Sequence, residues 1–402
     1  MIEFKLSVPN KISLFGEHML PYGYSGVAAG IELRTRMSFT EVSDVNRIVI
    51  KFPQIDLYFD KPLKEFLRVY KKCVSNKSKR EIWHEQVSQY ITACTSFTCT
   101  NDQRLILVAF FYLLICIAEK EKIRFKSFEI YLSTQLKIDT VFPCPSSFAV
   151  CFATGFLYWS RLQKGVVQNS FSNDDLKKIQ YTASLCTKIS SKFQEVDITV
   201  CTYGSTIVHR KTYMEGQASI NWNIFNMPEM VVLLVDSNKL QSLQEQLQEI
   251  TIKSNIVPNY IQHLITYLNN ETIVAVRTLF EIDSIQKNNQ LNAITRYGKL
   301  MIQQQELKNI SIRIQILLNL LIRPFYTSLN HICSIAQKHD MFAKYTDIGD
   351  GRYAYVLCAT YVSARIMAVS RKLELMGFDV TETTFSKLGL RIETEHTFLV
   401  ED

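Results

Sequence analysis

The sequence predicts an α+β protein of two domains, and three observations support this. A chain of 402 residues is longer than one typical domain and is expected to fold as two or three. Its hydrophobic fraction of 47% is ample for buried cores, which excludes a wholly disordered protein. Near the end of the chain, residues 352–360 and 378–394 have strand patterns and flank a helical segment at 361–376. Such a strand–helix–strand unit is typical of α+β domains.

The remaining elements follow from the spacing of apolar residues. Residues 2–8 alternate apolar and polar side chains, which is the pattern of a half-buried strand. Further strands are predicted at 31–40, 47–59, 127–133, 197–209 and 230–235. Helices are predicted at 81–95, 103–120, 146–162 and 174–192, as a series from about 239 to 339, and at 361–376, ending at Gly377. The pattern changes near 210–230, where residues 211–216 are expected to form a loop at a domain junction.

Composition and charge argue against several classes of protein. The formal net charge of +7 is spread along the chain, and the nearest basic cluster, within 71–80, is expected to be a solvated loop. Because nucleic-acid binding needs a clustered basic face, no nucleic-acid partner is expected. The apolar run from Leu105 to Ala118 is shorter than the roughly 20 residues of a membrane-spanning helix, so it predicts a buried core helix and no membrane partner. The ten cysteines lack metal-site spacing and residues 1–6 lack a signal-peptide layout, which favours a cytoplasmic location.

Glycine is scarce in this chain. There are 13 glycines, whereas average usage of about 7% would give roughly 28. Because glycine lets a backbone approach a phosphate closely, the shortage bears on any hypothesis of nucleotide binding.

The most informative segment is residues 8–18, where a strand leads into a proline-bounded turn, then Lys11, and then a Gly-Glu-His triplet ending at His18. A bare triplet of this kind is a weak signal, because it also fits a turn with a salt-bridged Glu17. The order P-x-K-x-x-L-x-G-E-H, with the stretches 22–23, 27–31 and 33–35 after it, resembles the opening motif of mevalonate kinases. These belong to the GHMP superfamily of galactokinases and of homoserine, mevalonate and phosphomevalonate kinases. Galactokinases continue the triplet with T-D-Y, which this chain does not.

A second stretch, residues 141–150, resembles the phosphate-binding loop of the same family, P-x-x-x-G-L-G-S-S before a helix. Ser146, Ser147 and the apolar helix remain, whereas the glycines of the loop are absent. In the family, backbone N–H groups and the positive end of the helix hold the phosphates, so the resemblance implies nucleotide binding at both serines. The alternative is that Ser146 only caps the helix after Pro145.

A third stretch, residues 191–200, resembles the family's G-x-P-S-G-x-D-x-x-V sequence and matches its aspartate to Asp197. The resemblance implies that Asp197 is the general base toward the acceptor hydroxyl, with Lys11 beside it. A carboxylate accepts the hydroxyl proton, while a nearby ammonium keeps it ionised and offsets developing charge. The alternative is that Asp197 is an ordinary residue at the start of a strand.

The magnesium ligands implied by the resemblance are the second serine of the loop, Ser147, and a glutamate eleven residues before the aspartate. Cys186 holds the latter position, and a thiol is a poor ligand for a cation that prefers oxygen. Whether Glu195 or another carboxylate replaces the glutamate is left open by the sequence.

The fourth stretch, residues 343–353, resembles the family's K-x-T-G-A-G-G-G-G-C loop. Gly349 and Gly351 remain, and the resemblance implies that they contact the nucleotide.

Two carboxylates, Asp347 and Asp350, interrupt this fourth pattern. They would repel a triphosphate unless Lys344, Arg352 or a metal ion offsets them. A loop that has lost its catalytic role is therefore an open alternative.

The resemblance as a whole implies a two-domain GHMP kinase fold, with an N-terminal mixed domain at residues 1–225 and a C-terminal ferredoxin-like domain at 226–402. It implies ATP-dependent phosphorylation of mevalonate to 5-phosphomevalonate, a step of isoprenoid and sterol biosynthesis, with Mg²⁺ as cofactor. The alternatives are a catalytically impaired relative that acts by binding, and a GHMP kinase for another small alcohol.

The resemblance also assigns roles to single residues. Lys11 and Asp197 are the expected catalytic residues, and Glu17 and His18 are expected to shape the acceptor pocket. The expected partners are mevalonate and ATP, with a homodimer as the candidate assembly.

Overall fold

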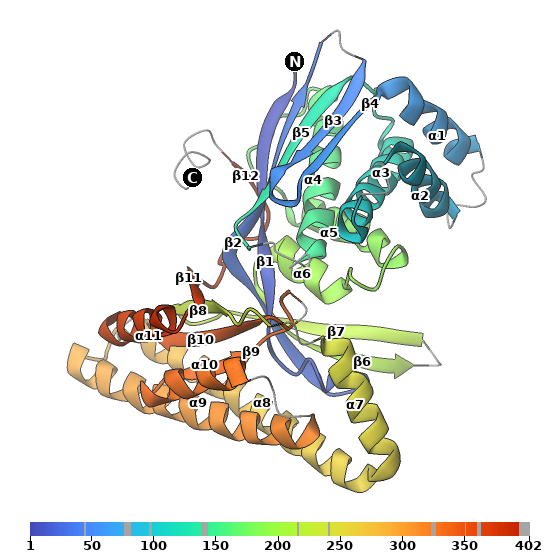
Figure 1. Cartoon of the computed structure of the whole chain (residues 1–402). Helices are drawn as coiled ribbons and strands as arrows, with labels where there is room; N and C mark the ends of the chain where they lie inside the picture. Colours follow the sequence, from blue (N-terminus) through green and yellow to red (C-terminus); the bar gives the residue numbers. More distant parts are fainter. Residues whose placement is uncertain are drawn as a thin grey trace. The chain divides into compact units, whose positions relative to one another are not determined.

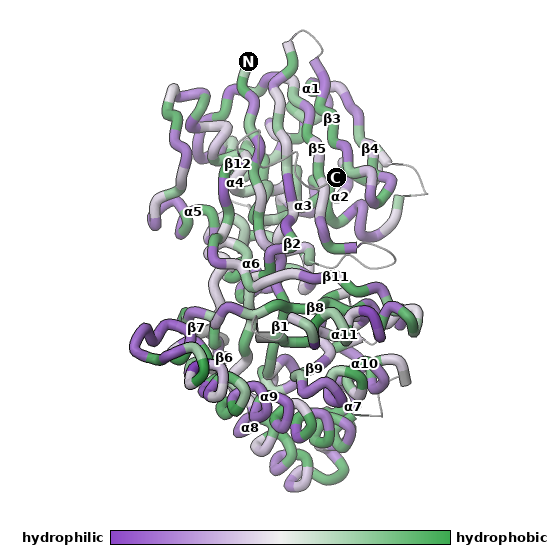
Figure 2. The backbone as a smooth tube through the Cα atoms, turned by 90° about the vertical axis from the view of Figure 1, so that its left-hand side faces the viewer, coloured by the Kyte–Doolittle hydropathy of each residue, from purple (hydrophilic) through white to green (hydrophobic). Residues whose placement is uncertain are grey.

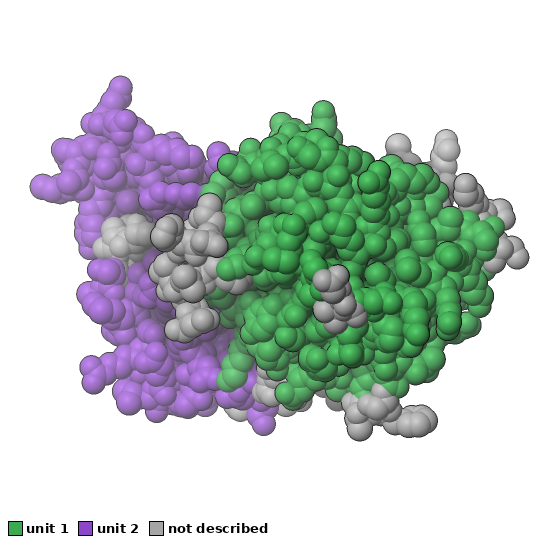
Figure 3. All heavy atoms as spheres, turned by 90° about the horizontal axis from the view of Figure 1, so that it is seen from above, with its two compact units in different colours: residues 1–10, 33–204, 388–402 green, residues 11–32, 205–387 purple. Residues whose placement is uncertain are grey.

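The computed structural model describes residues 1–43, 46–75, 82–95, 99–137, 144–214, 217–239, 242–322, 327–349, 351–359 and 363–393. The chain divides into two units by packing, which are coloured separately in Figure 3. Unit 1 comprises Met1–Asn10, Leu33–Gly204 and Leu388–Asp402, and unit 2 comprises Lys11–Glu32 and Ser205–Lys387. Neither unit is one continuous segment of the chain.

The units do not coincide with the predicted segments 1–225 and 226–402. Residues 11–32 and 205–225 pack with unit 2, and residues 388–393 pack with unit 1. The difference arises because strands β1 (Glu3–Phe15) and β2 (Ser25–Glu41) each contribute residues to both units. The predicted boundary at residue 225 divides the chain into two continuous segments, and it stays a prediction.

Unit 1 contains one sheet with helices against it. Besides parts of β1 and β2, its strands are β3 (Arg47–Phe52), β4 (Leu57–Pro62), β5 (Phe128–Thr134) and β12 (Arg391–Glu393), in the order β12-β1-β2-β5-β3-β4. Strand β3 is parallel to β5, whereas β12–β1, β2–β5 and β3–β4 are antiparallel pairs. The helices are α1 (Leu63–Ser75), α2 (Trp83–Cys94), α3 (Asn101–Glu121), α4 (Pro145–Gln163), α5 (Asn173–Ser184) and α6 (Glu195–Tyr203). Figure 1 shows these helices gathered on one side of the sheet.

Aromatic side chains join the sheet of unit 1 to its helices. The rings of Phe39 on β2 and Trp159 on α4 are 4.9 Å apart, and those of Phe52 on β3 and Phe148 on α4 are 5.2 Å apart. Helix α3 is long and apolar enough to cross a membrane, yet most of it is buried inside the unit. The prediction of a core helix at Leu105 to Ala118 is therefore confirmed.

Unit 2 contains a second sheet with ferredoxin-like order. Its strands are β8 (Met230–Asp236), β9 (Phe342–Tyr345), β10 (Tyr353–Ala359) and β11 (Asp379–Thr384), in the order β11-β8-β10-β9, with all neighbours antiparallel. Helix α11 (Ser363–Leu375) connects β10 to β11, and a helical series connects β8 to β9. The chain order is thus β-α-β-β-α-β. This confirms the predicted strand–helix–strand unit and the ferredoxin-like fold of the C-terminal part.

The helical series of unit 2 consists of α7 (Leu243–Ile256), α8 (Pro258–Lys287), α9 (Ala293–Leu321) and α10 (Thr327–Lys338). The two long helices α8 and α9 lie side by side in Figures 1 and 2, and hydrophilic and hydrophobic residues alternate along both. The buried residues of both helices recur mainly at spacings of three and four positions, so each helix buries one face and leaves the other to solvent. A hairpin of β6 (Thr206–Met214) and β7 (Gln217–Phe225) pairs with β2 at Ser25–Ala28.

The structure corrects the predicted beginning of the first motif. Strand β1 continues through Pro9 to Phe15, whereas the sequence predicted a turn after residue 8. Residues 8–15 are all buried, and burial on both faces keeps the chain extended although proline cannot donate a ladder hydrogen bond. Lys11 therefore lies on a strand.

The predicted strand at 197–209 is wrong in its first half. Residues 195–203 form helix α6, which ends at Gly204 with φ of 68°, and the strand begins only at Thr206. The β-branched residues in 196–200 favour a strand locally, but burial against the rest of unit 1 overrides this weak preference. Asp197 consequently lies in the first turn of a helix and not at the start of a strand.

Other boundaries also differ from the predicted ones. The segment 378–394 forms two strands, β11 in the sheet of unit 2 and β12 in that of unit 1. The segment 47–59 forms the hairpin of β3 and β4, helix α1 was not predicted, and α5 ends at Ser184. Of the predicted loop at 211–216, Glu215 and Gly216 lie outside the described residues and the rest belongs to β6.

We expect Gly204→Ala to lower the free energy of unfolding by more than about 2 kcal/mol, as measured by urea unfolding. A side chain in the left-handed region costs roughly 1 kcal/mol, and a Cβ here would lie 2.4 Å from backbone atoms of Leu388 and Gly389. The matched control is Gly165→Ala, where φ is 77° and nothing lies within 4 Å of the new Cβ. It should lose only the conformational cost, and equal losses in both variants would contradict a role for backbone contact.

Candidate active site

The lysine of the first motif forms a largely buried ion pair within unit 2. Lys11 Nζ lies 2.7 Å from Oδ2 of Asp347, and the two side chains are 7% and 15% exposed. The same Oδ2 accepts a hydrogen bond from the hydroxyl of Ser13 (2.8 Å), and Oδ1 accepts one from the hydroxyl of Thr346 (3.2 Å). Burial alone would raise the pKa of the Asp347 carboxyl, but the Lys11 ammonium and the two hydroxyls hold it at about 2. Asp347 is therefore a fixed anion at physiological pH.

The Gly-Glu-His triplet is buried beside a second ion pair. Lys344 Nζ on β9 contacts Oε1 of Glu17, and both side chains are almost fully buried. Nε2 of His18 lies 2.5 Å from Oε1 of Gln246 on α7. Burial lowers the pKa of His18, an effect that Glu17 opposes and Lys344 reinforces. The imidazole of His18 is therefore neutral at neutral pH.

His209 on β6 adds a second neutral imidazole to this cluster. Its ring is buried, and its Nε2 would lie 2.8 Å from a Cβ on Gly26 of β2, so glycine at that position leaves room for the ring. Burial and, after it, the charge of Lys11 lower the pKa of His209 to about 4, while Asp347 opposes them. The ring can thus donate or accept a hydrogen bond without adding charge.

The loop between β9 and β10 is anchored by side chains. Arg352 Nε donates to Oδ1 of Asp236 on β8 (2.5 Å), and both side chains are buried. The backbone N–H of Thr346 donates to the carbonyl oxygen of Tyr353 (2.9 Å), which closes the base of the loop. Gly349 and Gly351 have φ of 59° and 79°, so they provide the left-handed turns that other residues disfavour.

In unit 1, Ser146 and Ser147 lie in the first turn of α4 and have no exposed surface. Ser147 Oγ donates to the carbonyl oxygen of Cys144 (2.8 Å) and lies 2.8 Å from the hydroxyl of Thr35 on β2. Ser146 Oγ accepts a hydrogen bond from the backbone N–H of Gln194 (3.4 Å). Cys144 holds the N-cap position of α4. The alternative that Ser146 caps this helix is therefore wrong.

Asp197 lies half-buried in the first turn of α6. Negative charge is stabilised there by the positive end of the helix dipole. Asp197 belongs to unit 1 and Lys11 to unit 2, so each is described by the surroundings in its own unit.

Several known mevalonate kinases match this chain over more than half of its length. It is 20% identical over 398 residues to the mevalonate kinase of Bos taurus, which covers 97% of this chain and 94% of that relative. It is 24% identical over 250 residues to the mevalonate kinase of Candida albicans, which covers 59% of this chain and 57% of that relative, less than two thirds of its length. No family model matches the chain.

Among solved structures, the chain resembles the mevalonate kinase of Methanococcus jannaschii, with a TM-score of 0.65 at 14% identity over 96% of this chain and 98% of that one. It also resembles the phosphomevalonate kinase of Streptococcus pneumoniae in complex with phosphomevalonate and AMPPNP, with a TM-score of 0.60 at 14% identity over 96% and 100% of the two chains.

The chain is a distant homologue of the mevalonate kinases and has the GHMP kinase fold. The predicted α+β fold class with two sheets is thereby confirmed.

The predicted site residues of this mevalonate kinase homologue fall into two groups. Unit 2 holds Lys11, Glu17, His18, Gly349 and Gly351, and unit 1 holds Ser146, Ser147 and Asp197. The structure brings Lys11, Glu17 and His18 into one buried cluster through their partners Asp347, Lys344 and Gln246. The roles assigned to all of these residues stay predictions.

The cation that neutralises the carboxylate of Asp347 differs from those that the sequence suggested. The sequence offered Lys344, Arg352 or a metal ion for this role. In the structure Lys344 pairs with Glu17 and Arg352 with Asp236, and it is Lys11 that pairs with Asp347. Asp350, together with residues 141–143 of the second motif, lies outside the described residues.

Sequence reasoning missed His209 and Gln246 as members of the cluster. Both reach it only through tertiary contacts with distant segments, β2 for His209 and the triplet for Gln246. The one local signal was Gly26, whose missing side chain accommodates the His209 ring.

The donors around Ser147 do not fit the magnesium site that the mevalonate kinase resemblance implies. The Ser147 hydroxyl is already hydrogen bonded within unit 1, and burial raises the pKa of the Cys186 thiol well above its usual value. Glu195 is exposed at the start of α6. In the part of the chain that the structure describes, no group of three or more His, Cys, Asp or Glu side chains is placed to hold a metal ion.

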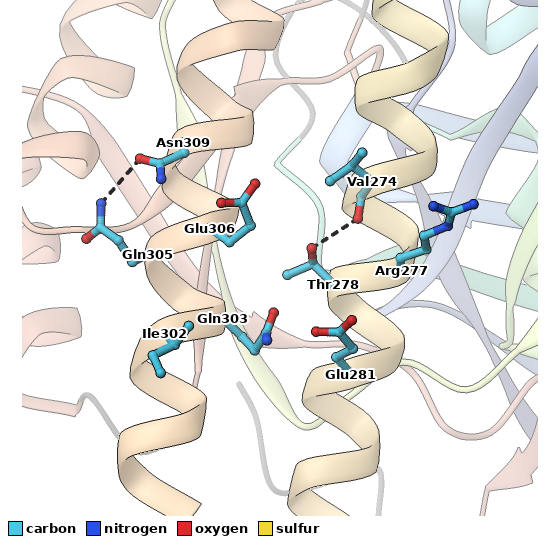
Figure 4. Close-up of a pocket in the computed structure, with 9 residues that line it drawn as sticks. All are labelled: Val274, Arg277, Thr278, Glu281, Ile302, Gln303, Gln305, Glu306 and Asn309. Atoms are coloured by element: carbon cyan, nitrogen blue, oxygen red, sulfur yellow. Dashed lines mark hydrogen bonds between the residues drawn. The ribbon is translucent and has the colours of Figure 1, made fainter.

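A groove of about 530 Å³ lies between α8 and α9 in unit 2 (Figure 4), and the residues that line it include none of the predicted site residues. Its polar groups are partly satisfied within their own helices. The hydroxyl of Thr278 donates to the carbonyl oxygen of Val274 (3.0 Å), and Gln305 Nε2 donates to Oδ1 of Asn309 (3.3 Å). The lining residues are Val274, Arg277, Thr278, Glu281, Ile302, Gln303, Gln305, Glu306 and Asn309.

We expect the folded protein to lose stability between pH 6.5 and 4 through His209. Its pKa is about 4 in the folded state and about 6.5 when unfolded, so the unfolded state binds more protons in this interval and stability falls as pH falls. The loss from this one group is roughly 3 kcal/mol across the interval. Urea unfolding of the wild type and His209→Asn as a function of pH measures it.

The His209→Asn variant should show a shallower decline over this interval than the wild type. The exposed His263→Asn serves as matched control and should keep the wild-type slope. Identical pH profiles for His209→Asn and the wild type would show that the ring does not resist protonation.

We expect Lys344→Met to lower the free energy of unfolding by about 3–5 kcal/mol, because removal of one partner leaves the buried Glu17 carboxylate without a counter-charge. Adding Glu17→Gln in the double variant should recover a large part of the loss, since the uncompensated charge is then gone. Urea unfolding of the wild type, both single variants and the double variant gives the coupling energy. Additive losses would mean that the pair contributes nothing.

Proposed function

We propose that this protein is an ATP-dependent phosphotransferase that phosphorylates the primary hydroxyl of mevalonate to give 5-phosphomevalonate. The observation that carries the proposal is the cluster of unit 2, in which Lys11, Glu17 and His18 are buried and each has a polar partner. The chain that holds this cluster has the GHMP kinase fold and aligns with mammalian mevalonate kinases over nearly its full length.

In the proposed reaction the acceptor hydroxyl oxygen attacks the γ-phosphorus of ATP. The bond from this phosphorus to the bridging oxygen breaks, and ADP leaves. Asp197 accepts the hydroxyl proton, Lys11 offsets negative charge on the transferred group, and Glu17 and His18 shape the acceptor pocket. Phosphoryl transfer depends mainly on positioning and electrostatic stabilisation, which fits residues that are already held by partners.

The proposed nucleotide contacts are the first turn of α4, with Ser146 and Ser147, and the turns at Gly349 and Gly351. A helix N-terminus offers backbone N–H groups and the positive end of the dipole to phosphates. The Mg²⁺ cofactor, a homodimeric assembly and a cytoplasmic location stay predictions.

A second candidate function is that of a relative without kinase activity that binds a metabolite or a partner. It is favoured by the buried thiol of Cys186, which stands where the resemblance implies a carboxylate ligand, and by the hydrogen bonds that hold the Ser147 hydroxyl within unit 1. A rise in melting temperature with Mg-ATP that disappears without Mg²⁺ would argue against this candidate. A kinase for another small alcohol shares the same site, and turnover with a panel of acceptor alcohols separates it from a mevalonate kinase.

We expect Asp197→Asn to lower kcat with mevalonate and Mg-ATP by about 10²- to 10⁴-fold, the usual contribution of a general base. A coupled assay that follows ADP release measures the rate. The matched control in the same unit is Asp174→Asn, whose side chain is 94% exposed, and it should keep wild-type turnover. If the wild type turned over no faster than Asp197→Asn at any pH, the proposed mechanism with Asp197 as general base would be wrong.

A further inference from the structure

The carboxylate of Asp347 stands where the family resemblance implies a glycine, and its surroundings show how that charge is accommodated. Both of its oxygens accept hydrogen bonds, Oδ2 from Lys11 and Ser13 and Oδ1 from Thr346. Three donors from two separate segments therefore fix one carboxylate. An aspartate that only interfered with phosphate binding would not need such a set of donors.

The backbone that carries Asp347 is also held in place. Thr346 pairs with Tyr353 at the base of the loop, and Arg352 on the other side of the loop is bound to Asp236 of β8. Gly349 turns the chain between these anchors with φ of 59°. The carboxylate therefore sits on a short connection between paired strands.

The charged form of Lys11 is stabilised by this partner. Its side chain is 7% exposed, and a buried ammonium without a counter-charge loses protons easily because desolvation disfavours the charged form. The other carboxylates of the cluster are engaged elsewhere, Glu17 with Lys344 and Asp236 with Arg352.

Among the residues that the structure describes, three further titratable groups are influenced by the charge of Asp347, and none of them competes for Lys11. They are His18 after β1, His209 on β6 and Tyr355 on β10. Burial lowers the pKa of both histidines and raises that of Tyr355 well above its usual value, so all three are uncharged near neutral pH. Lys11 and Asp347 are thus the charged members of this group of residues.

We propose that Asp347 is a positioning residue of the kinase, which keeps the Lys11 ammonium charged and fixed in place. This inference rests on the proposed function, in which Lys11 offsets charge on the transferred phosphoryl group. The loss of a glycine at this position is then a replacement by a side chain with a definite task and not a decay of the loop.

The first test compares Asp347→Asn with the wild type across the pH range. The amide keeps the size of the side chain but removes the negative charge that lies 2.7 Å from the Lys11 ammonium, so the pKa of Lys11 should fall. We expect kcat at pH 8 to fall by about 10- to 100-fold, and the alkaline limb of the kcat profile to move down by about one pH unit or more, with little change in KM for ATP. Asp347→Glu should restore part of the rate and of the profile.

The matched control is Asp340→Asn, just before β9. Asp340 is 41% exposed and pairs with Lys308 (2.6 Å) outside the cluster. It should leave kcat and its pH profile unchanged. An Asp347→Asn enzyme with a wild-type profile, or with higher kcat than the wild type, would overturn the inference while leaving the proposed function intact.

A second test does not depend on turnover. In protein labelled with ¹⁵N-lysine, the Lys11 Nζ resonance is assigned by its loss in Lys11→Arg and followed as a function of pH. The pKa of Lys11 should be lower in Asp347→Asn than in the wild type and recover in Asp347→Glu. An unchanged Lys11 titration overturns the inference even if the wild type proves to have no kinase activity, a result that by itself would overturn only the proposed function.

Discussion

The ion pair between Lys11 and Asp347 is the constraint on which the polar interior of unit 2 depends. A lysine whose side chain is only 7% exposed must meet a counter-charge, because the cost of removing an ammonium from water is otherwise not offset. With Asp347 committed to Lys11, the buried Glu17 needs Lys344, and Arg352 needs Asp236. These three pairs link β1, β8, β9 and the loop after β9 through charge as well as through strand pairing.

The same pairs explain how this chain manages with few glycines around its fourth motif. A glycine-rich loop lets a backbone approach phosphates closely. Here Asp347 and Arg352 instead anchor the connection from β9 to β10 by their side chains. The glycines that remain at 349 and 351 serve turns with positive φ. The described residues of this connection are thus held by side-chain contacts within unit 2, and the nucleotide contacts of Gly349 and Gly351 remain part of the proposal.

The fold was predictable wherever local pattern and tertiary burial agree. The apolar run of α3, the helix after Ser146 and the unit of β10, α11 and β11 were all found near their predicted positions. Prediction failed where burial overrides local preference, as in the β-branched helix α6 and in β1 beyond Pro9. It also failed for β12, because a strand within one predicted segment can pair in a different sheet, and no local pattern encodes that choice.

By itself, the sequence determined the fold class, the order of the four motifs and the residues Lys11, Glu17 and His18 as a group, since motif order and spacing are properties of the chain. Only the tertiary structure decided which charges meet. The partner of Lys11 lies 336 positions further along the chain, and that of Glu17 lies 327 positions away. Contacts over such distances depend on how β1 and β9 come together in unit 2, and electrostatic pairing then follows from burial. For this reason the sequence marked Asp347 as an interruption, and the structure identifies it as the counter-charge of Lys11.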